Sequence, residues 1–268
     1  FLFRFSLRAQ VRAGPGRAWA VRAARAVFVV CDTRAPLRTL REMLPELPAE
    51  KLILLRDPLT LTPPEDDADI PLPSGAQEAQ PLQILAVGTI SKRKGYDLLL
   101  RACAQLRAQG LDFRLKIVGQ GPERLRLRWL AWRLGLRRLV EFTGQMPHEN
   151  MADFYKKADI FVSPGRKTSQ GDVDGLPSAL AEAMAFGLAV VVSDLPGLTE
   201  AVEDGKSGLV VPRNDAAALA RALERLAGDP EERRRLGGAA RTRIHDLLDA
   251  QEDESPLGAL FSRAIRGA

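Results

Sequence analysis

The segment DGLPSALAEAM carries two acidic residues at fixed distances from a proline. Pro177 suits the first position of a helix because its missing N–H would have no acceptor there, and the amides around Gly175 and Ser178 would face an anion. Glu182 lies five residues beyond Pro177, about 7.5 Å along a helix axis at 1.5 Å per residue. The spacing predicts a diphosphate at the helix start, with Glu182 on its ribose side and Asp174 on the other. The alternative is an exposed helical glutamate and an ordinary loop acid.

A second candidate for binding phosphate is the segment GTISKRKG, residues 88–95. Gly88 permits close approach of the backbone, and Lys92, Arg93 and Lys94 supply positive charge just before a helix is expected to start. Basic residues before a helix also occur in ordinary surface loops, so this segment alone does not establish a site.

Short, almost wholly apolar segments alternate with helical patterns from residue 82 onward, which predicts a parallel sheet covered on both faces. The fold class is therefore α/β, a Rossmann-like doubly wound sheet. Ligands of such sheets collect beyond the carboxyl ends of the strands, where both candidate segments lie. Strands are expected at 82–88, 113–119, 139–144, 159–164, 188–194 and 208–211. Helices are expected at 96–109, 122–134, 150–157 and 198–202, and from residues 177, 215 and 230.

The chain divides into four predicted parts. Residues 1–62 offer a basic helix, a strand at 26–31, a helix at 36–43 and a strand at 51–55, which is the tail end of a lobe. Residues 63–81 contain five prolines and several acids, typical of an exposed linker. Residues 82–250 form the Rossmann-like domain, and 251–268 a C-terminal helix. Because the chain starts at a phenylalanine, we expect it to be a fragment of a longer protein.

Composition narrows the function classes. Two distant cysteines and two histidines do not build a metal site, and they favour a reduced, cytoplasmic setting. No apolar run is long enough for a membrane span. No motif of aromatic residues interleaved with basic ones accompanies the arginines, so no nucleic-acid partner is expected. Asp172 and Asp174 spell a metal-binding Asp-x-Asp signature, which we interpret as a coincidence.

Ordered motifs resemble those of the family 4 glycosyltransferases, which are retaining enzymes of the GT-B fold. They are VGTISKRKG, IVGQGPE, VEFTGQMPHE, ADIFVSP, the two-acid segment of residues 174–184, and SDLPGLTEAVEDGKSGLVV, and they cover about residues 82–226. The resemblance implies transfer of a sugar from a nucleoside-diphosphate sugar, without a metal or other cofactor. It also implies that the helices from residue 230 pack back toward the first lobe.

The resemblance also assigns residues. Lys94 resembles the lysine that neutralises the donor diphosphate, Glu182 the glutamate that holds the ribose, and Asp174 the acid that contacts the donor sugar; these three form the predicted catalytic set. Where the family usually has arginine this chain has Thr89, and Asp174 is shorter than the family's glutamate. The predicted donor-binding set comprises Gly88, Thr89, Arg93, Lys94, Gly119, Gly121, Met146, Gly175, Leu176, Pro177, Ser178 and Glu182, with Gly119, Gly121 and Met146 around the base.

The implied partners are a nucleotide-sugar donor and a glycan or lipid-linked acceptor. Because residues 1–80 contain too little of the lobe that binds the acceptor, we expect the isolated chain to bind donor and to transfer sugar poorly. The alternative is a non-catalytic remnant that binds a nucleotide or a partner.

The helix expected at 122–134 is apolar on two sides. Leu127, Leu130, Ala131 and Leu134 form one stripe, and Leu125, Trp129 and Trp132 form another roughly opposite. A helix on a sheet buries only one stripe, and arginines flank the second. We therefore hypothesise that the second stripe contacts an anionic membrane, which would place the protein peripherally at the inner membrane face, or contacts the absent lobe. The alternative is that the indoles fold onto the protein itself.

Overall fold

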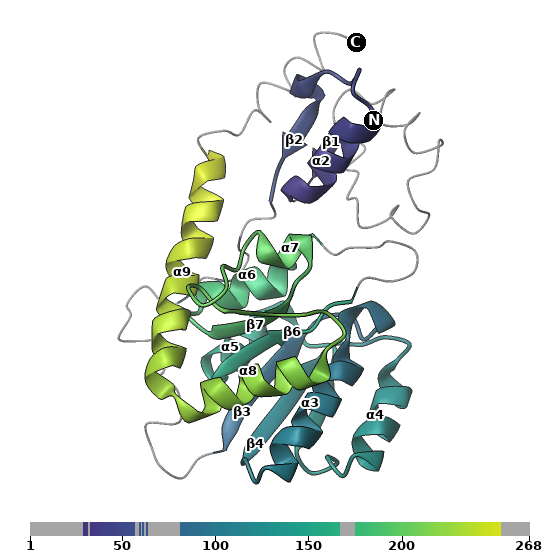
Figure 1. Cartoon of the computed structure of the whole chain (residues 1–268), viewed down its shortest axis with the longest axis vertical. Coiled ribbons are helices and arrows are strands. Elements are labelled where there is room, and N and C mark those ends of the chain that lie inside the picture. The colour runs from purple at the N-terminus through teal and green to yellow at the C-terminus, as the bar shows by residue number, and fades with distance from the viewer. Residues whose placement is uncertain are drawn as a thin grey trace.

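The computed structural model describes residues 29–31, 33–56, 59, 61, 63, 81–166 and 175–252 (Figure 1). The basic segment at 1–28, most of the predicted linker, the loop that holds Asp174 and nearly all of the predicted C-terminal helix lie outside the described residues.

A six-stranded parallel sheet forms the main body and confirms the predicted Rossmann-like fold. Its strands lie side by side in the order β5-β4-β3-β6-β7-β8. All the strands are short. The central strands β6 and β7 are almost fully buried, as expected for a sheet that is covered on both faces, whereas the edge strand β5 is only partly buried. The bounds are β3 Leu82–Val87, β4 Phe113–Val118, β5 Val140–Gly144, β6 Ile160–Ser163, β7 Ala189–Ser193 and β8 Leu209–Val211.

Helices form a layer on each face of the sheet, with a separate hydrophobic core under each layer. One core packs α3, α4 and α8 against alternate strand residues, and the other packs α5, α6, α7 and α9 against the remaining ones. The bounds are α3 Tyr96–Ala108, α4 Arg124–Arg133, α5 Met151–Lys156, α6 Ser178–Ala185, α7 Pro196–Thr199, α8 Ala216–Gly228 and α9 Pro230–Glu252. The short 3-10 helices η5 Lys92–Lys94 and η6 His148–Asn150 precede α3 and α5.

A small unit precedes this lobe. Strands β1 Val29–Cys31 and β2 Leu52–Leu54 pair in parallel, α2 Arg34–Met43 packs on them, and η2 Ala49–Lys51 leads into β2. The unit lies at the α7 end of the molecule, far from α4 (Figure 1).

One carboxylate joins the small unit to the lobe. Glu200, next to the end of α7, accepts hydrogen bonds from the Arg34 amide at 2.7 Å and from Arg56 Nη2 at 2.5 Å. Arg56, which is 6% exposed, also donates to the Leu247 carbonyl of α9 at 3.1 Å. The last helix therefore packs back toward the segment that follows the small unit, as the resemblance implied.

The two apolar stripes of α4 have opposite environments. Leu127, Leu130 and Ala131 are buried in the core under α3 and α8. Trp129 and Trp132 stay 53% and 61% exposed, so they do not fold onto the described part of the protein.

Candidate functional site

The sheet has a topological switch point between β3 and β6. From β3 the chain continues to β4 and β5 on one side, and from β6 it continues to β7 and β8 on the other. Ligands of open parallel sheets bind in the crevice beyond the carboxyl ends at such a point. Lys94 lies in the loop after β3, and Glu182 lies in α6, which follows β6. The topology thus places both predicted residues in elements that border the same crevice.

Backbone hydrogen bonds join the loops at this edge of the sheet. The Gly88 amide donates to the Val118 carbonyl at 2.9 Å, and the Gly119 amide donates to the Gly144 carbonyl at 2.8 Å. The Ile90 amide donates to the Gln120 carbonyl at 2.8 Å. The loops after β3, β4 and β5 therefore form one connected floor.

Two of the predicted glycines are required by this floor itself. A Cβ on Gly119 would lie 2.1 Å from the Gly88 carbonyl oxygen, and a Cβ on Gly121 would lie 2.2 Å from the Ile90 carbonyl oxygen. Gly119 also has a φ of +141°, which disfavours a side chain. These contacts explain why glycine is needed at positions 119 and 121, whether or not either residue contacts the nucleotide base.

Lys94 crosses the open side of Gly88. A Cβ on Gly88 would lie 3.3 Å from Lys94 Cε and 3.8 Å from its Nζ, so the missing side chain makes room for the lysine. Lys94 is partly exposed, whereas Lys92 in the same turn is exposed. The ammonium therefore lies directly above the glycine at the end of β3.

The basic loop is also joined to the segment that leads from β6 toward α6. The Arg166 amide donates to the Arg93 carbonyl at 2.8 Å, and Arg166 Nη2 pairs with Asp97 Oδ2 at 2.8 Å. Gly95 sits so close to Pro164 that a Cβ would lie 1.8 Å from the Pro164 carbonyl oxygen. These contacts bind the two sides of the switch point together.

Pro177 is the N-cap of α6, not its first helical residue as predicted. Its φ of −67° and ψ of 129° are extended, and its carbonyl accepts from the Leu180 amide at 2.9 Å. The sequence interpretation was one residue off because proline's fixed φ suits either position. Among the residues that the structure describes, no side chain makes a capping hydrogen bond at the start of α6. The first amides of a helix have no intrahelical acceptor, so the residues from Ser178 onward present donors and a positive dipole end to the crevice.

Glu182 is 6% exposed, which excludes the alternative of an ordinary surface glutamate. The Tyr155 hydroxyl of α5 donates to Glu182 Oε2 at 2.8 Å, and the ring of Tyr155 packs against Phe186 and Phe161. Burial raises the pKa of Tyr155, and the neighbouring Glu182 charge and hydrogen bond raise it further. The hydroxyl therefore stays protonated and holds the carboxylate in one orientation.

His148 of η6 also lies next to Glu182. Its Nε2 is 3.9 Å from Glu182 Oε1, and its side chain is 49% exposed. Sequence reasoning missed Tyr155 altogether, because a tyrosine in a short charged helix carries no signal of its role.

The remaining predicted residues have different outcomes. Thr89 is exposed, Arg93 is partly exposed, and Met146 packs at the edge of the core that contains Tyr155. Gly175 is partly exposed and Leu176 is buried before α6. Asp174 lies outside the described residues. In the described part of the chain no group of three or more His, Cys, Asp or Glu is placed to hold a metal ion, and no helix has the length and apolarity to cross a membrane.

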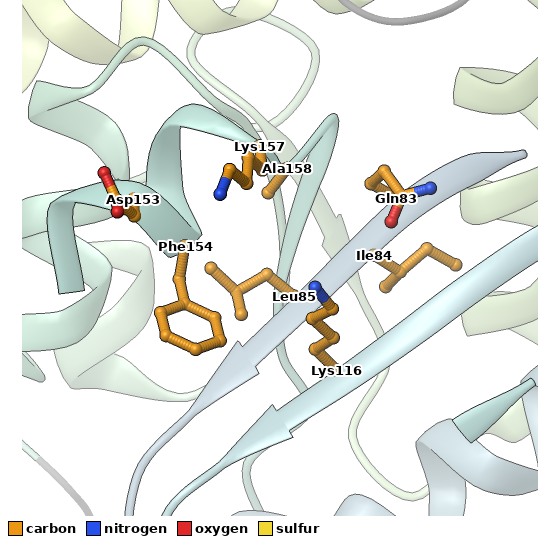
Figure 2. A pocket seen from close by; sticks show the side chains of 8 residues that line it. All are labelled: Gln83, Ile84, Leu85, Lys116, Asp153, Phe154, Lys157 and Ala158. Carbon is orange, nitrogen blue, oxygen red and sulfur yellow. The ribbon is translucent and has the colours of Figure 1, made fainter. Parts of the chain in front are cut away.

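A separate cavity of about 80 Å³ lies between α5 and strands β3 and β4 (Figure 2). Asp153 and Phe154 line it from α5, Lys157 lines it from the residue after that helix, and Gln83 and Lys116 line it from β3 and β4 (Figure 2). Pockets for drug-sized ligands measure roughly 300–1,000 Å³. This cavity is too small for a nucleotide and lies away from the carboxyl ends of the strands.

Sequence comparisons give the family context. Residues 73–243 match the family model described as glycosyl transferases group 1. The putative colanic acid biosynthesis glycosyltransferase WcaL of Escherichia coli (strain K12) is 42% identical over 145 residues, which cover 54% of this chain and 36% of WcaL. A GDP-mannose-dependent alpha-(1-6)-phosphatidylinositol monomannoside mannosyltransferase of Mycolicibacterium smegmatis is 37% identical over 167 residues, which cover 62% of this chain and 43% of the relative. The chain thus spans less than half the length of these curated relatives.

Solved structures share the fold. A sucrose-phosphate synthase from Thermosynechococcus elongatus superposes with a TM-score of 0.76 at 27% identity, over 93% of this chain and 61% of that one. Alr3699/HepE from Anabaena, solved in complex with UDP, superposes with a TM-score of 0.72 at 20% identity, over 89% of this chain and 66% of that one.

Proposed function

Because the chain belongs to the group 1 glycosyl transferases, a family of the GT-B fold, we propose that it is the donor-binding part of a retaining enzyme that moves a sugar from a nucleoside-diphosphate sugar to a glycan or glycolipid acceptor. The observation that supports this proposal is the topology of the sheet: Lys94 follows β3 and α6 follows β6, the two strands at the switch point, and Glu182 of α6 is buried. The positive groups suit the diphosphate end of a nucleoside diphosphate, and the fixed carboxylate suits its ribose end.

In this proposal the diphosphate lies between Lys94 and the first amides of α6. A helix start and an ammonium both stabilise phosphate oxygens. The nucleoside extends toward Glu182, whose carboxylate accepts hydrogen bonds from the ribose hydroxyls. Tyr155 fixes the orientation of that carboxylate through the 2.8 Å hydrogen bond.

The same groups support catalysis. Breaking the bond between the sugar and the diphosphate develops positive charge on the sugar and negative charge on the leaving phosphate. Lys94, Arg93 and the helix amides stabilise that negative charge, and preorganised donors of this kind contribute strongly to rate. Asp174 is proposed to contact the donor sugar on the far side of the diphosphate. The reaction needs no metal or other cofactor.

The donor is proposed to be a hexose nucleotide, with GDP-mannose as the first candidate. Two of the relatives are GDP-mannose-dependent mannosyltransferases, at 37% and 34% identity. UDP-glucose is the second candidate, because HepE was solved in complex with it. The base is decided by loops at the crevice, so both nucleotides belong in the first binding experiment.

The isolated chain is proposed to bind donor but to transfer sugar weakly, because residues 1–80 contain too little of the lobe that binds the acceptor. The second candidate function is a nucleotide-binding module without transfer. It is favoured by exposed Thr89, which stands where the family has an arginine. Incubation with labelled GDP-mannose separates the two functions. Release or transfer of labelled mannose indicates the enzyme, whereas binding of the nucleotide without either indicates the module.

Calorimetric titration with GDP, GDP-mannose, UDP and UDP-glucose tests the proposal. A hydrogen bond to a charged group contributes about 1.5–3 kcal/mol, so Lys94→Ala should weaken binding roughly 10- to 150-fold. Lys92→Ala removes the same charge from an exposed position of the same turn and should change affinity less than about threefold. If no nucleotide binds the chain, or if both variants weaken binding equally, the proposed placement of the diphosphate is wrong.

A further inference from the structure

The outer side of α4 carries an unusual combination of exposed groups. Leu125, Trp129 and Trp132, spaced four and three residues apart, lie on one side of the helix and are 77%, 53% and 61% exposed. Among the described residues they are the large hydrophobic side chains that remain exposed. We call this side, with the exposed arginines at its margins, the α4 face. The opposite side of α4 is buried, so no rotation of the helix can hide both stripes.

The α4 face is strongly basic. The segment 124–138 contains six arginines and no acid, and five of them are exposed: Arg126, Arg128, Arg133, Arg137 and Arg138. Arg126 pairs at 2.5 Å with Glu123, the N-cap residue of α4. Arg114 adds a further guanidinium to this margin, because its Nη1 donates to the Arg138 carbonyl at 3.4 Å. Positive charge therefore surrounds the two indoles.

We propose that the α4 face docks on an anionic membrane surface. Tryptophan side chains are favoured at the membrane interface, where an apolar ring and a polar N–H are both satisfied. Arginines at the edge of such a surface bury their aliphatic stems and keep their charge at the lipid headgroups. The combination of two indoles, a leucine and a basic margin matches this partner in both polarity and charge.

The same features argue against two other partners. A symmetric pair of chains would bring one basic α4 face against another, and like charges would repel. Single-stranded nucleic acid stacks its bases on open aromatic faces. Trp129 has the Arg133 guanidinium 5.2 Å from its ring centroid, so one face of that ring is already covered by the protein's own cation. An interfacial tryptophan needs no such open face.

The position of α4 in the fold permits docking. The helix lies on the outside of the lobe, at the opposite end from β1, β2 and α2 (Figure 1). It is also outside the floor formed by the loops after β3, β4 and β5. Docking through the α4 face therefore leaves the candidate donor site open, and the inference does not rest on the proposed function.

Fluorescence with vesicles tests the proposal directly. A third tryptophan, Trp19, lies in the basic N-terminal segment, so the full chain is used with Trp19→Phe to leave only the two α4 indoles. Vesicles of phosphatidylcholine containing phosphatidylglycerol should shift the indole emission to the blue, and vesicles of phosphatidylcholine alone should not. Added salt should reverse the shift because the attraction to the lipid headgroups is screened.

Matched variants locate the contact. Each arginine near an anionic leaflet contributes roughly fivefold to binding, so Arg128→Glu should weaken co-sedimentation with the anionic vesicles roughly tenfold or more. Arg221→Glu changes an exposed arginine of α8 and should have less than about a twofold effect. Replacing Trp129 and Trp132 together by alanine should weaken binding by roughly tenfold. Circular dichroism of each variant confirms that the fold is retained.

Several results would overturn the proposal. Unshifted emission in the Trp19→Phe chain would show that the indoles do not enter the interface. Vesicle binding that survives the double tryptophan change and Arg128→Glu undiminished would place the contact in another segment, such as the basic N-terminus. Tighter binding to an oligonucleotide than to anionic vesicles, or a dimer that Trp132→Ala disperses, would assign the α4 face to a different partner.

Discussion

Replacing Tyr155 by phenylalanine removes a single hydroxyl from the wall of the candidate site. The ring is 1% exposed and packs against Phe186 and Phe161, at centroid distances of 5.3 and 6.3 Å. Phenylalanine keeps this packing. The change therefore removes the hydrogen bond from Tyr155 to Glu182 Oε2 at 2.8 Å, together with a longer one to the Ala179 carbonyl at 3.4 Å.

The size of the expected destabilisation follows from the chemistry of the hydrogen bond between Tyr155 and Glu182. Hydrogen bonds to charged groups contribute about 1.5–3 kcal/mol, and the buried carboxylate loses a donor that water cannot easily replace. We expect the free energy of unfolding to fall by about 2 kcal/mol. With a urea dependence of about 2 kcal/mol per molar, the midpoint of urea unfolding should fall by about 1 M. Because the carboxylate also loses its fixed orientation, nucleotide affinity should fall with it.

The assay is urea unfolding followed by circular dichroism, combined with a double-mutant cycle. In a Glu182→Gln background the acceptor is neutral, so Tyr155→Phe should cost only about 1 kcal/mol. The difference between the two backgrounds measures the charge-assisted part of the bond. If Tyr155→Phe changes the free energy of unfolding by less than about 0.5 kcal/mol, or costs the same in both backgrounds, the inference that Tyr155 holds Glu182 is wrong.

Two further predictions concern α9. A Cβ on Gly237 would lie 1.9 Å from the Gly187 carbonyl oxygen, whereas one on Gly238 would meet nothing within 4 Å. Gly237→Ala should therefore lower the free energy of unfolding by about 1–3 kcal/mol. Gly238→Ala should raise it by up to about 1 kcal/mol. Equal effects of the two substitutions in urea unfolding would contradict the close packing of Gly237 on Gly187. Glu232 accepts hydrogen bonds from Arg225, which hold its pKa below the usual range, so its stabilisation is present above the unfolded-state pKa and is lost as the pH falls through the folded-state pKa. Glu232→Gln should lower the free energy of unfolding by less than about 1 kcal/mol at neutral pH, because Arg225 is largely exposed, and should not change it in strong acid. A decrease that persists in acid would show that the effect comes from packing and not from the ion pair.

The sheet was predictable because its signal is local. Apolar runs at 82–88 and 113–119 became β3 and β4 to within a residue or two, and the alternation with helices specified parallel strands. The prediction that Lys94 and Glu182 border one crevice rests on the same pattern, since the carboxyl ends of parallel strands share an edge. The family resemblance is confirmed by the match over residues 73–243.

The supports of the site were not predictable in the same way. Tyr155 precedes β6 and Glu182 follows it, so only packing of α5 against α6 brings them together, and no spacing in the chain encodes that contact. His148 approaches Glu182 for the same reason. The close contacts of Gly119 and Gly121 with neighbouring loops depend on strand register, which sequence alone does not give. Long-range packing thus accounts for what the sequence reasoning missed.

The floor of the crevice is held by main-chain groups, from Gly88 through Gly119 to Gly144. Amides and carbonyls are the same in every amino acid, so most side chains that project from these turns are free to change without dismantling the platform. Under the proposed function, a lineage with this architecture can exchange such residues and acquire a new preference for sugar or base while the proposed anchoring of phosphate persists. The glycines set the boundary of that freedom, because a single methyl group at Gly119 would push the turns apart.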